Sequence, residues 1–153
     1  MIEIIDAIRA ALVANTELVR LVGSADAITA QWPDQNAEFS QPPAGDDYSG
    51  LGAVDTPRAR VPIVRVAAVL ADAIVGVRDE DYQVSVFSYS DRFNSRLAEL
   101  IQGTLNTHPC DPAGVIVNEQ YCGDAGAQSY DQPTRLFQQN LTVNLTWLRR
   151  LTS

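Results

Sequence analysis

The feature that most constrains this chain is an alternation of apolar and polar residues near its C-terminal end. From Phe137 to Trp147 every second position is apolar, except for the interruption at Gln139. A period of two over about ten residues predicts a long β-strand with one face in a core. The other face is uncharged, and it is either solvated or in contact with a neighbouring subunit, where charge is depleted. Its residues are Gln138, Asn140, Thr142, Asn144 and Thr146.

Three segments have the spacing of helices. Residues 3–14 carry apolar side chains at helical intervals, and Asn15 and Gly23 then bracket a short second helix. Asp91 is expected to cap a third helix, which continues to about residue 106 with a single apolar stripe. A stripe of that width is typical of a helix that packs on a sheet.

Four further segments are rich in apolar, β-branched or aromatic residues, which favours strands. They are 27–32, 62–71, 81–90 and 114–122. The first is expected at a sheet edge and the second to be buried on both faces, so that Arg65 needs an outlet. Residues 123–133 are expected to be a turn-rich connection.

The segment between the second and third of these strands has two interpretations. Residues 72–79 either lengthen the preceding strand or form a hairpin around Gly76. The acidic run 79–81 is expected to be a solvated turn at the entry to the next strand. A cation at this run is the less favoured alternative.

This order of elements predicts one α+β domain spanning 1–153. The expected architecture is a mostly antiparallel sheet of four to five strands with two main helices packed on one face. A length of 153 residues fits a single domain with one core. Residues 33–60 have no periodicity and are expected to form a long loop or arm, and loops of that length are normally functional or disordered.

The charge distribution argues against a nucleic-acid binder. The chain has 11 basic residues, all Arg, against 19 acidic residues, for a net charge of −8. Binding to phosphates needs a basic face, which the scattered Arg residues do not supply. Between Arg20 and Arg58 all the charged residues are acidic: Asp26, Asp34, Glu38, Asp46, Asp47 and Asp55.

No motif in the chain predicts catalysis, a cofactor or a metal. The single histidine, His108, stands at a helix end, and a chain without Lys has neither a P-loop nor a Schiff base. His108, Cys110, Asp111 and Cys122 do not have the paired spacing of zinc ligands. Paired carboxylates of the glycosidase kind are compatible with 19 acids, but no pair is singled out. We therefore expect a protein that is not an enzyme.

The redox and membrane expectations follow from the same composition. Cys110 and Cys122 are expected to be free, buried or half-buried thiols in a reducing compartment. Acidic residues near Met1 argue against a signal peptide, and no apolar run approaches the ~20 residues of a membrane span. The expected protein is soluble, has no membrane partner and is made in a cytosol.

The order of elements and five short segments resemble a known family. The segments are 21–23 (LVG), 32–33 (WP), 62–66 (PIVRV), 82–88 (YQVSVFS) and 130–137 (YDQPTRLF). Together they resemble the tail-completion proteins of long-tailed bacteriophages, also called tail terminators or head-to-tail joining proteins. The resemblance covers nearly the whole chain.

The resemblance implies a structural role in a virion tail or neck, with assembly in the host cytoplasm. Such proteins form a hexameric ring that caps the tail tube, ends its polymerisation and joins the tail to the head connector or stopper protein. DNA passes through the ring as cargo that is not bound. On this interpretation the acidic charge keeps DNA from adhering to the channel.

A ring that closes head to tail needs two different patches on each subunit. One candidate patch is the uncharged face at 138–146 or an edge strand, and the other is the 33–60 loop. The candidate interface residues are Asp34, Glu38, Asp46, Asp47, Asp55, Gln138, Asn140, Thr142 and Asn144.

Two other functions remain open. The first is another neck or head-completion ring protein, a stopper or an adaptor. The second is a small-molecule-binding or enzymatic α+β domain, which would need a concave pocket with convergent polar groups.

Overall fold

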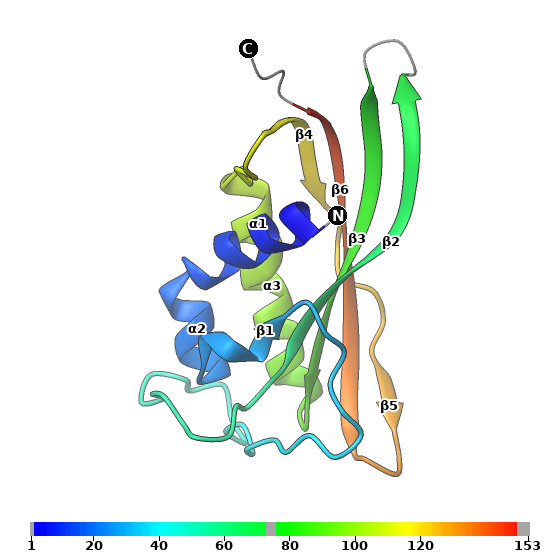
Figure 1. The fold of residues 1–153 in the computed structure, drawn as a ribbon. Coiled ribbons are helices and arrows are strands. Elements are labelled where there is room, and N and C mark those ends of the chain that lie inside the picture. Colours follow the sequence, from blue (N-terminus) through cyan, green and yellow to red (C-terminus); the bar gives the residue numbers. More distant parts are fainter. Residues whose placement is uncertain (1, 73–75, 150–153) are drawn as a thin grey trace.

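The computed structural model of the chain describes residues 2–72 and 76–149. Figure 1 shows a group of helices beside a long, twisted sheet. The elements in chain order are α1 (Ile2–Val13), α2 (Thr16–Val22), the short 3₁₀-helix η1 (Ala25–Ala27), β1 (Ile28–Thr29), β2 (Val61–Asp72), β3 (Val77–Ser88), α3 (Asp91–Thr107), β4 (Val115–Cys122), β5 (Ser129–Asp131) and β6 (Leu136–Arg149).

The sheet has six strands and is mostly antiparallel, which confirms the α+β class. β2, β3, β6 and β4 lie side by side in that order, each antiparallel to its neighbours. β1 adds to the start of β2 by a short parallel pairing, and β5 pairs with the start of β6. β5 lies within 123–133, where composition predicts only a connection, because three residues are too few to show a period.

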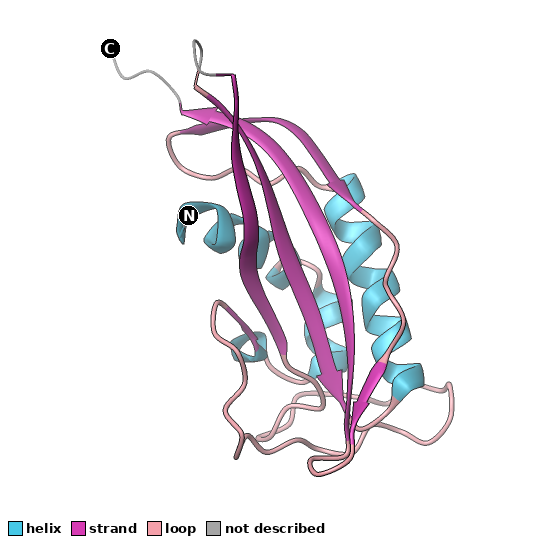
Figure 2. Cartoon of the chain, turned by 90° about the vertical axis from the view of Figure 1, so that its right-hand side faces the viewer, coloured by secondary structure: helices cyan, strands magenta, loops and turns pink. Residues whose placement is uncertain are grey.

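Within the described residues, the helices cover one face of this sheet and leave the other face free of helices. α1 and α3 are the two main helices and contact β2, β3, β4 and β6 between them. In Figure 2 the helix-free face is turned toward the viewer and the helices lie behind it. The core is a single cluster between the helices and the sheet.

The central strand, β6, follows its alternating sequence. Leu141, Val143, Leu145 and Trp147 are buried, and the residues between them are half-buried or exposed. Pairing with β3 on one side and β4 on the other holds this register. A slip by one residue would move the whole apolar set to the solvent face.

The helix ends agree with the sequence at α2 and differ by one residue at α3. The Asn15 side chain accepts a hydrogen bond from the Leu18 N–H, and Gly23 ends α2 in a left-handed conformation with φ of 102°. α3 is capped by Ser90, which accepts from the Phe93 N–H, so Asp91 lies in the first turn and not at the cap. Both residues favour a helix N-terminus, so sequence alone does not separate them.

The first edge strand is shorter than predicted. Residues Ala25–Ala27 form η1, and only Ile28–Thr29 pair with β2. Trp32 lies beyond the strand, half-exposed, with its ring edge-on to Phe87 at 5.1 Å. A bulky side chain at this position needs a partner, and tertiary contact with β3 supplies it.

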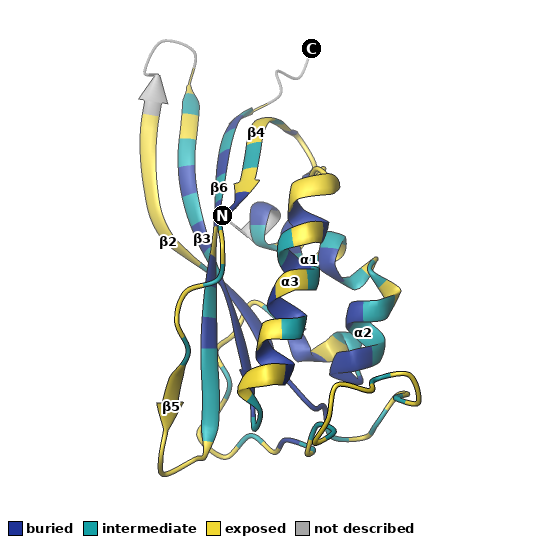
Figure 3. Cartoon of the chain, turned by 180° about the vertical axis from the view of Figure 1, so that it is seen from behind, coloured by how far each residue is buried: buried dark blue, intermediate teal, exposed yellow. Residues whose placement is uncertain are grey.

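The apolar segment 62–71 is not buried on both faces, which corrects the prediction. Ile63 is buried, but residues 65–70 are all exposed. In Figures 1 and 3 the outer parts of β2 and β3 extend beyond the helices as a hairpin, so no layer covers them. Of the 72–79 segment, residues 73–75 lie outside the described residues, and the described remainder extends this hairpin.

The acidic run 79–81 is not a solvated turn, which is a second correction. β3 begins at Val77, so Asp79, Glu80 and Asp81 lie inside a strand that is paired on both sides. Alternation along the strand sends Asp79 and Asp81 to the helix-free face and Glu80 to the core face, where it is buried.

Candidate interaction surfaces

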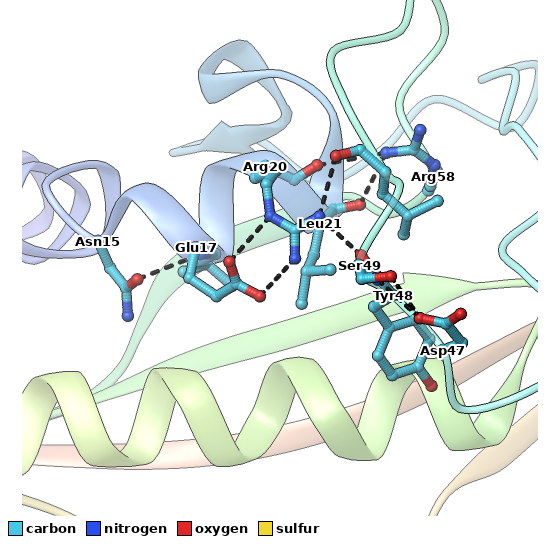
Figure 4. A network of polar contacts seen from close by, with 10 residues as sticks. Asn15, Glu17, Arg20, Leu21, Asp47, Tyr48, Ser49 and Arg58 are labelled. Carbon is cyan, nitrogen blue, oxygen red and sulfur yellow. Dashed lines mark hydrogen bonds and ion pairs between the residues drawn. The ribbon is translucent and has the colours of Figure 1, made fainter.

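The long loop between β1 and β2 is anchored on α2 and is not a free arm. Arg20, near the end of α2, donates hydrogen bonds from Nη1 to the carbonyl oxygens of Tyr48 (2.7 Å) and Leu51 (2.9 Å). The Glu17 carboxylate holds the same guanidinium, and this hydrogen bond lowers the pKa of Glu17. Figure 4 shows Arg20 between α2 and the loop.

A second arginine closes the loop against the end of α2. Arg58 is buried, and its Nη1 donates to the carbonyl oxygens of Arg20 (3.3 Å) and Leu21 (3.2 Å). These are terminal helix carbonyls that lack partners within the helix, so a cation is favoured there. Burial lowers the pKa of Arg58, with a smaller contribution from the charge of Arg20. The backbone at Gly23 also accepts from the Val54 N–H.

The five candidate acids of the loop are all exposed, but they do not form one patch. Asp46 pairs with Arg92 of α3 at 3.3 Å. Asp34 lies in a groove beside β5 and β6, with Gln138 in the same lining. The Asp47 carboxylate accepts two hydrogen bonds from Ser49, which lower its pKa. The loop therefore spreads its charge around the end of the molecule.

The backbone carbonyl of Glu38 accepts a hydrogen bond from Arg60 at 3.0 Å. Asp55, the fifth of these acids, lies in the last part of the loop before β2 and is exposed. Neither residue lies in the groove that contains Asp34 and Gln138.

The uncharged face of β6 is part of a wider polar surface on the helix-free side of the sheet. The Asn140 Oδ1 accepts hydrogen bonds from Ser85 (2.7 Å) and from Gln138 (2.9 Å). The Asn144 side chain donates to the carboxylates of Asp79 and Asp81 on β3. Thr142 is exposed between these two groups. The structure thus brings Gln138, Asn140, Thr142 and Asn144 into one surface and adds two carboxylates to it.

On the face of the sheet that the helices cover, a buried charged residue, Glu80, lies at the base of the projecting β2–β3 hairpin. The Glu80 carboxylate accepts from the Trp147 indole N–H and forms an ion pair with Arg65 at 3.2 Å. The Arg65 side chain is half-exposed, which is the outlet that a charged residue in an apolar strand needs. Trp147 and Glu80 are both almost fully buried.

Exposed apolar residues lie along the two outer strands of the sheet. Val66, Val69 and Leu70 of β2 are about half exposed or more, and on β4 Ile116 is 40% exposed and Tyr121 is 63% exposed. Figure 3 shows the outer part of β2 in the colour of exposed residues. Sequence reasoning missed these residues, because a continuous apolar run is typical of a buried strand.

A groove of about 400 Å³ lies between the start of the loop and the β5–β6 hairpin. Trp32, Phe87 and Tyr130 contribute aromatic surface to it, and Asp34 and Asp131 contribute carboxylates. Trp32 and Tyr130 are about half exposed. The groove thus combines aromatic and acidic groups at the end of the molecule opposite the projecting hairpin.

The two cysteines are free and buried, as the sequence predicts. Burial raises the pKa of the Cys110 and Cys122 thiols to about 11, and at Cys122 the charge of Asp124 adds to the effect. The thiol forms are therefore unreactive at neutral pH. Within residues 2–72 and 76–149, no three His, Cys, Asp or Glu side chains are grouped as metal ligands. In the same part of the chain, no helix is long and apolar enough to span a membrane.

Comparison with solved structures finds the same fold in a virus-like particle. The chain superposes with a TM-score of 0.63 on a chain from the virion of a native gene transfer agent (GTA) particle. The alignment covers 94% of this chain and 93% of the other, at 13% sequence identity. No protein-family model and no curated protein matches the sequence. At this level of identity the likeness shows a shared fold, and function has to be argued from surfaces.

Proposed function

We propose that this chain is a structural protein of a phage-like particle that caps the tail tube as a ring, ends its polymerisation and joins it to the head connector. It acts in the tail or neck of the virion and has no catalytic role. The main support for this proposal is that the chain shares its fold with a chain of a GTA virion over nearly the full length of both chains. That breadth favours a shared architecture over a shared motif.

The distribution of charge on the sheet supports a channel for DNA. The helix-free residues of β3 and β6 include Asp79, Asp81, Asn140 and Asn144 and contain no basic side chain from 79 to 85 or from 138 to 146. A surface of this kind does not bind phosphates. If this face lines the ring, DNA passes along it as cargo and does not adhere.

The five loop acids have a different place in this proposal. The loop that carries them lies at the end of the molecule away from the projecting hairpin (Figure 1). All five are exposed: Asp34, Glu38, Asp46, Asp47 and Asp55. We assign this end to contacts with the unlike neighbours, the tube protein and the connector or stopper. An anchored loop presents such contacts at low entropic cost.

Electron microscopy of particles that lack this gene tests the proposal. Without a tail terminator, we expect overlong tails that are not attached to heads, because nothing ends the polymerisation of the tube. A missing stopper or adaptor, which is the alternative neck role, instead leaves tails of normal length beside heads that lose DNA. Normal particles would contradict both roles. Complementation with the intact gene is the control.

A further inference from the structure

The open sheet has two unpaired edges, and we infer that copies of this chain join head to tail by pairing the β2 edge of one copy with the β4 edge of the next. This inference rests on the proposed function in one respect, namely that a ring is required. Within the described residues, no strand pairs with the outer edge of β2 beyond Pro62 or with the outer edge of β4.

The β2 edge has little of the charge, and beyond Pro62 none of the proline, that often protect solvent-facing edges, although bulges interrupt it between Arg65 and Ala67 and between Leu70 and Asp72. From Ile63 to Leu70 it contains no Pro and a single charged residue, Arg65. Val66, Val69 and Leu70 are exposed on it. A long apolar edge of this kind is a template for pairing with another chain, so a natural protein keeps one only where a partner covers it.

The strand directions make the second edge of the same sheet a suitable partner. β2 is antiparallel to β3, β3 to β6 and β6 to β4, so β2 and β4 run in opposite directions. A copy related by rotation about an axis along the strands therefore places its β4 antiparallel to the first copy's β2. Antiparallel pairing is the more stable arrangement.

The two edges also match in level and in length. Bulges divide both edges, and the longest regular stretch is Ala67–Leu70 on β2 and Glu119–Cys122 on β4. Through β3 and β6, Ala67 lies in one row with Tyr121, and Val69 lies in one row with Glu119. The Asn106 side chain donates a hydrogen bond to the Cys122 carbonyl oxygen and accepts one from the Cys122 N–H. The part of the β4 edge that is available to another strand therefore ends at Tyr121.

The side chains that meet across this pairing are mostly apolar. In the shared rows Ala67 lies opposite Tyr121 and Val69 lies opposite Glu119, and Val69 and Tyr121 are both more than half exposed. Arg65 lies in the row of Cys122 and is already paired with Glu80, so it takes no part in this contact. Pairing of β2 with β2 would close a twofold dimer and not a ring. A second copy presenting β4 is therefore the partner that fits.

Single substitutions on each edge test the inference by sedimentation velocity and native mass spectrometry. We expect the wild-type chain to form a closed oligomer, and Val69→Asp or Tyr121→Asp to weaken self-association by about tenfold or more. Adding Glu119→Lys to Val69→Asp should restore much of the association, because the two new charges are opposite. Tyr130→Asp, at a similarly exposed aromatic residue on β5, is the matched control and should assemble normally.

Mixing the two single variants identifies the pairing directly. The Val69→Asp chain retains an intact β4 edge and the Tyr121→Asp chain an intact β2 edge, so the mixture should form dimers and no closed ring. If β2 paired with β2, Tyr121→Asp alone would assemble normally. That result would overturn the inference, as would a wild-type chain that stays monomeric at all concentrations.

Two further results separate this inference from the proposed function. If Val69→Asp left self-association intact but abolished attachment to tail tubes, the β2 edge would bind the tube protein, and the inference would be wrong while the function held. If the edges paired as described but loss of the gene left normal tails and heads, the proposed function would be wrong and the pairing would stand. Circular dichroism of each variant establishes that it is folded.

Discussion

Single residues at the end of α2 decide how the long loop is held. Gly23 has a φ of 102°, and a Cβ added there would lie 2.5 Å from Cγ2 of Val54 in the loop. The sequence predicts the glycine cap, because Gly after a short apolar helix is a common C-terminal signal. It does not predict that the loop passes over the cap, because that contact joins residues about 30 positions apart.

Gly23→Ala should destabilise the protein by about 2 kcal/mol or more. The left-handed conformation costs about 1 kcal/mol for a residue with a Cβ, and the overlap with Val54 adds a packing cost of at least similar size. Urea denaturation measures the loss. Gly50→Ala is the control, because a Cβ there meets nothing within 4 Å and the backbone is not left-handed. Equal stability of the two variants would contradict this account of the cap.

The buried thiols predict a loss of stability at alkaline pH. The pKa values of Cys110 and Cys122 are raised from 9.0 to about 11 in the folded chain. Because the pKa of each thiol is higher in the folded chain than in the unfolded chain, the stabilisation that the protonated thiols provide is complete below pH 9. It decreases as the pH rises toward 11. In that window each thiol lowers the free energy of unfolding by at most about 1.4 kcal/mol per pH unit.

Thermal melting between pH 8 and pH 11 checks this prediction. The Cys110→Ala/Cys122→Ala variant should be less stable at pH 8 but should lose less stability across the window than the wild type. A thiol reagent at pH 8 should react with both cysteines only after denaturation. Rapid reaction of either thiol in the folded protein would show that it is not buried.

At the scale of elements, the length of the β2–β3 hairpin and its buried base depend on contacts between distant residues. The alternation of β3 can be recognised in the sequence from residue 82 onward. The acidic run 79–81 does not have the composition of a strand, so the start of β3 at Val77 is not predicted. Glu80 is accommodated because Trp147 and Arg65 both bind its carboxylate. The sequence does not predict that these three residues are in contact, because only the register of the sheet brings them together.

Replacing Glu80 separates its charge from its hydrogen bonding. Glu80→Ala leaves the buried Trp147 N–H without its acceptor and Arg65 without its ion pair, and should cost about 3 kcal/mol. Glu80→Gln retains an acceptor for Trp147 and should cost clearly less. Chemical denaturation followed by tryptophan fluorescence measures both. Glu99→Ala, which breaks an exposed pair with Arg96 on α3, should have little effect. Equal costs for the two Glu80 variants would show that the indole hydrogen bond is unimportant.

At the scale of the whole molecule, two separate regions each bring several acidic side chains together. One is the helix-free face with Asp79 and Asp81, and the other is the anchored loop with Asp46 and Asp47. The net charge of −8 is known from composition, but composition does not say which acids share a surface. Under the proposed function, only the first region faces passing DNA.

Charge reversal in the two regions tests this assignment with matched changes. Particles carrying Asp79→Lys/Asp81→Lys should release DNA several-fold more slowly, because a basic channel attracts phosphates. Particles carrying Asp46→Lys/Asp47→Lys undergo the same change in net charge and should release DNA at the normal rate. Fluorescence assays of DNA release measure both, and tail length serves as the check on assembly. The opposite result would assign the loop to the channel.

The sequence by itself determined the class of fold and most of its elements, because helical and strand periods depend on residues close together in the chain. It predicted β6 and its register of buried residues, the glycine cap of α2 and the two free cysteines. Only the tertiary structure decided where the helices end against the sheet, and hence that residues 65–70 of β2 are exposed. It also decided which acids gather on the helix-free face and which sheet edges stay open, since these properties depend on pairings between strands far apart in sequence.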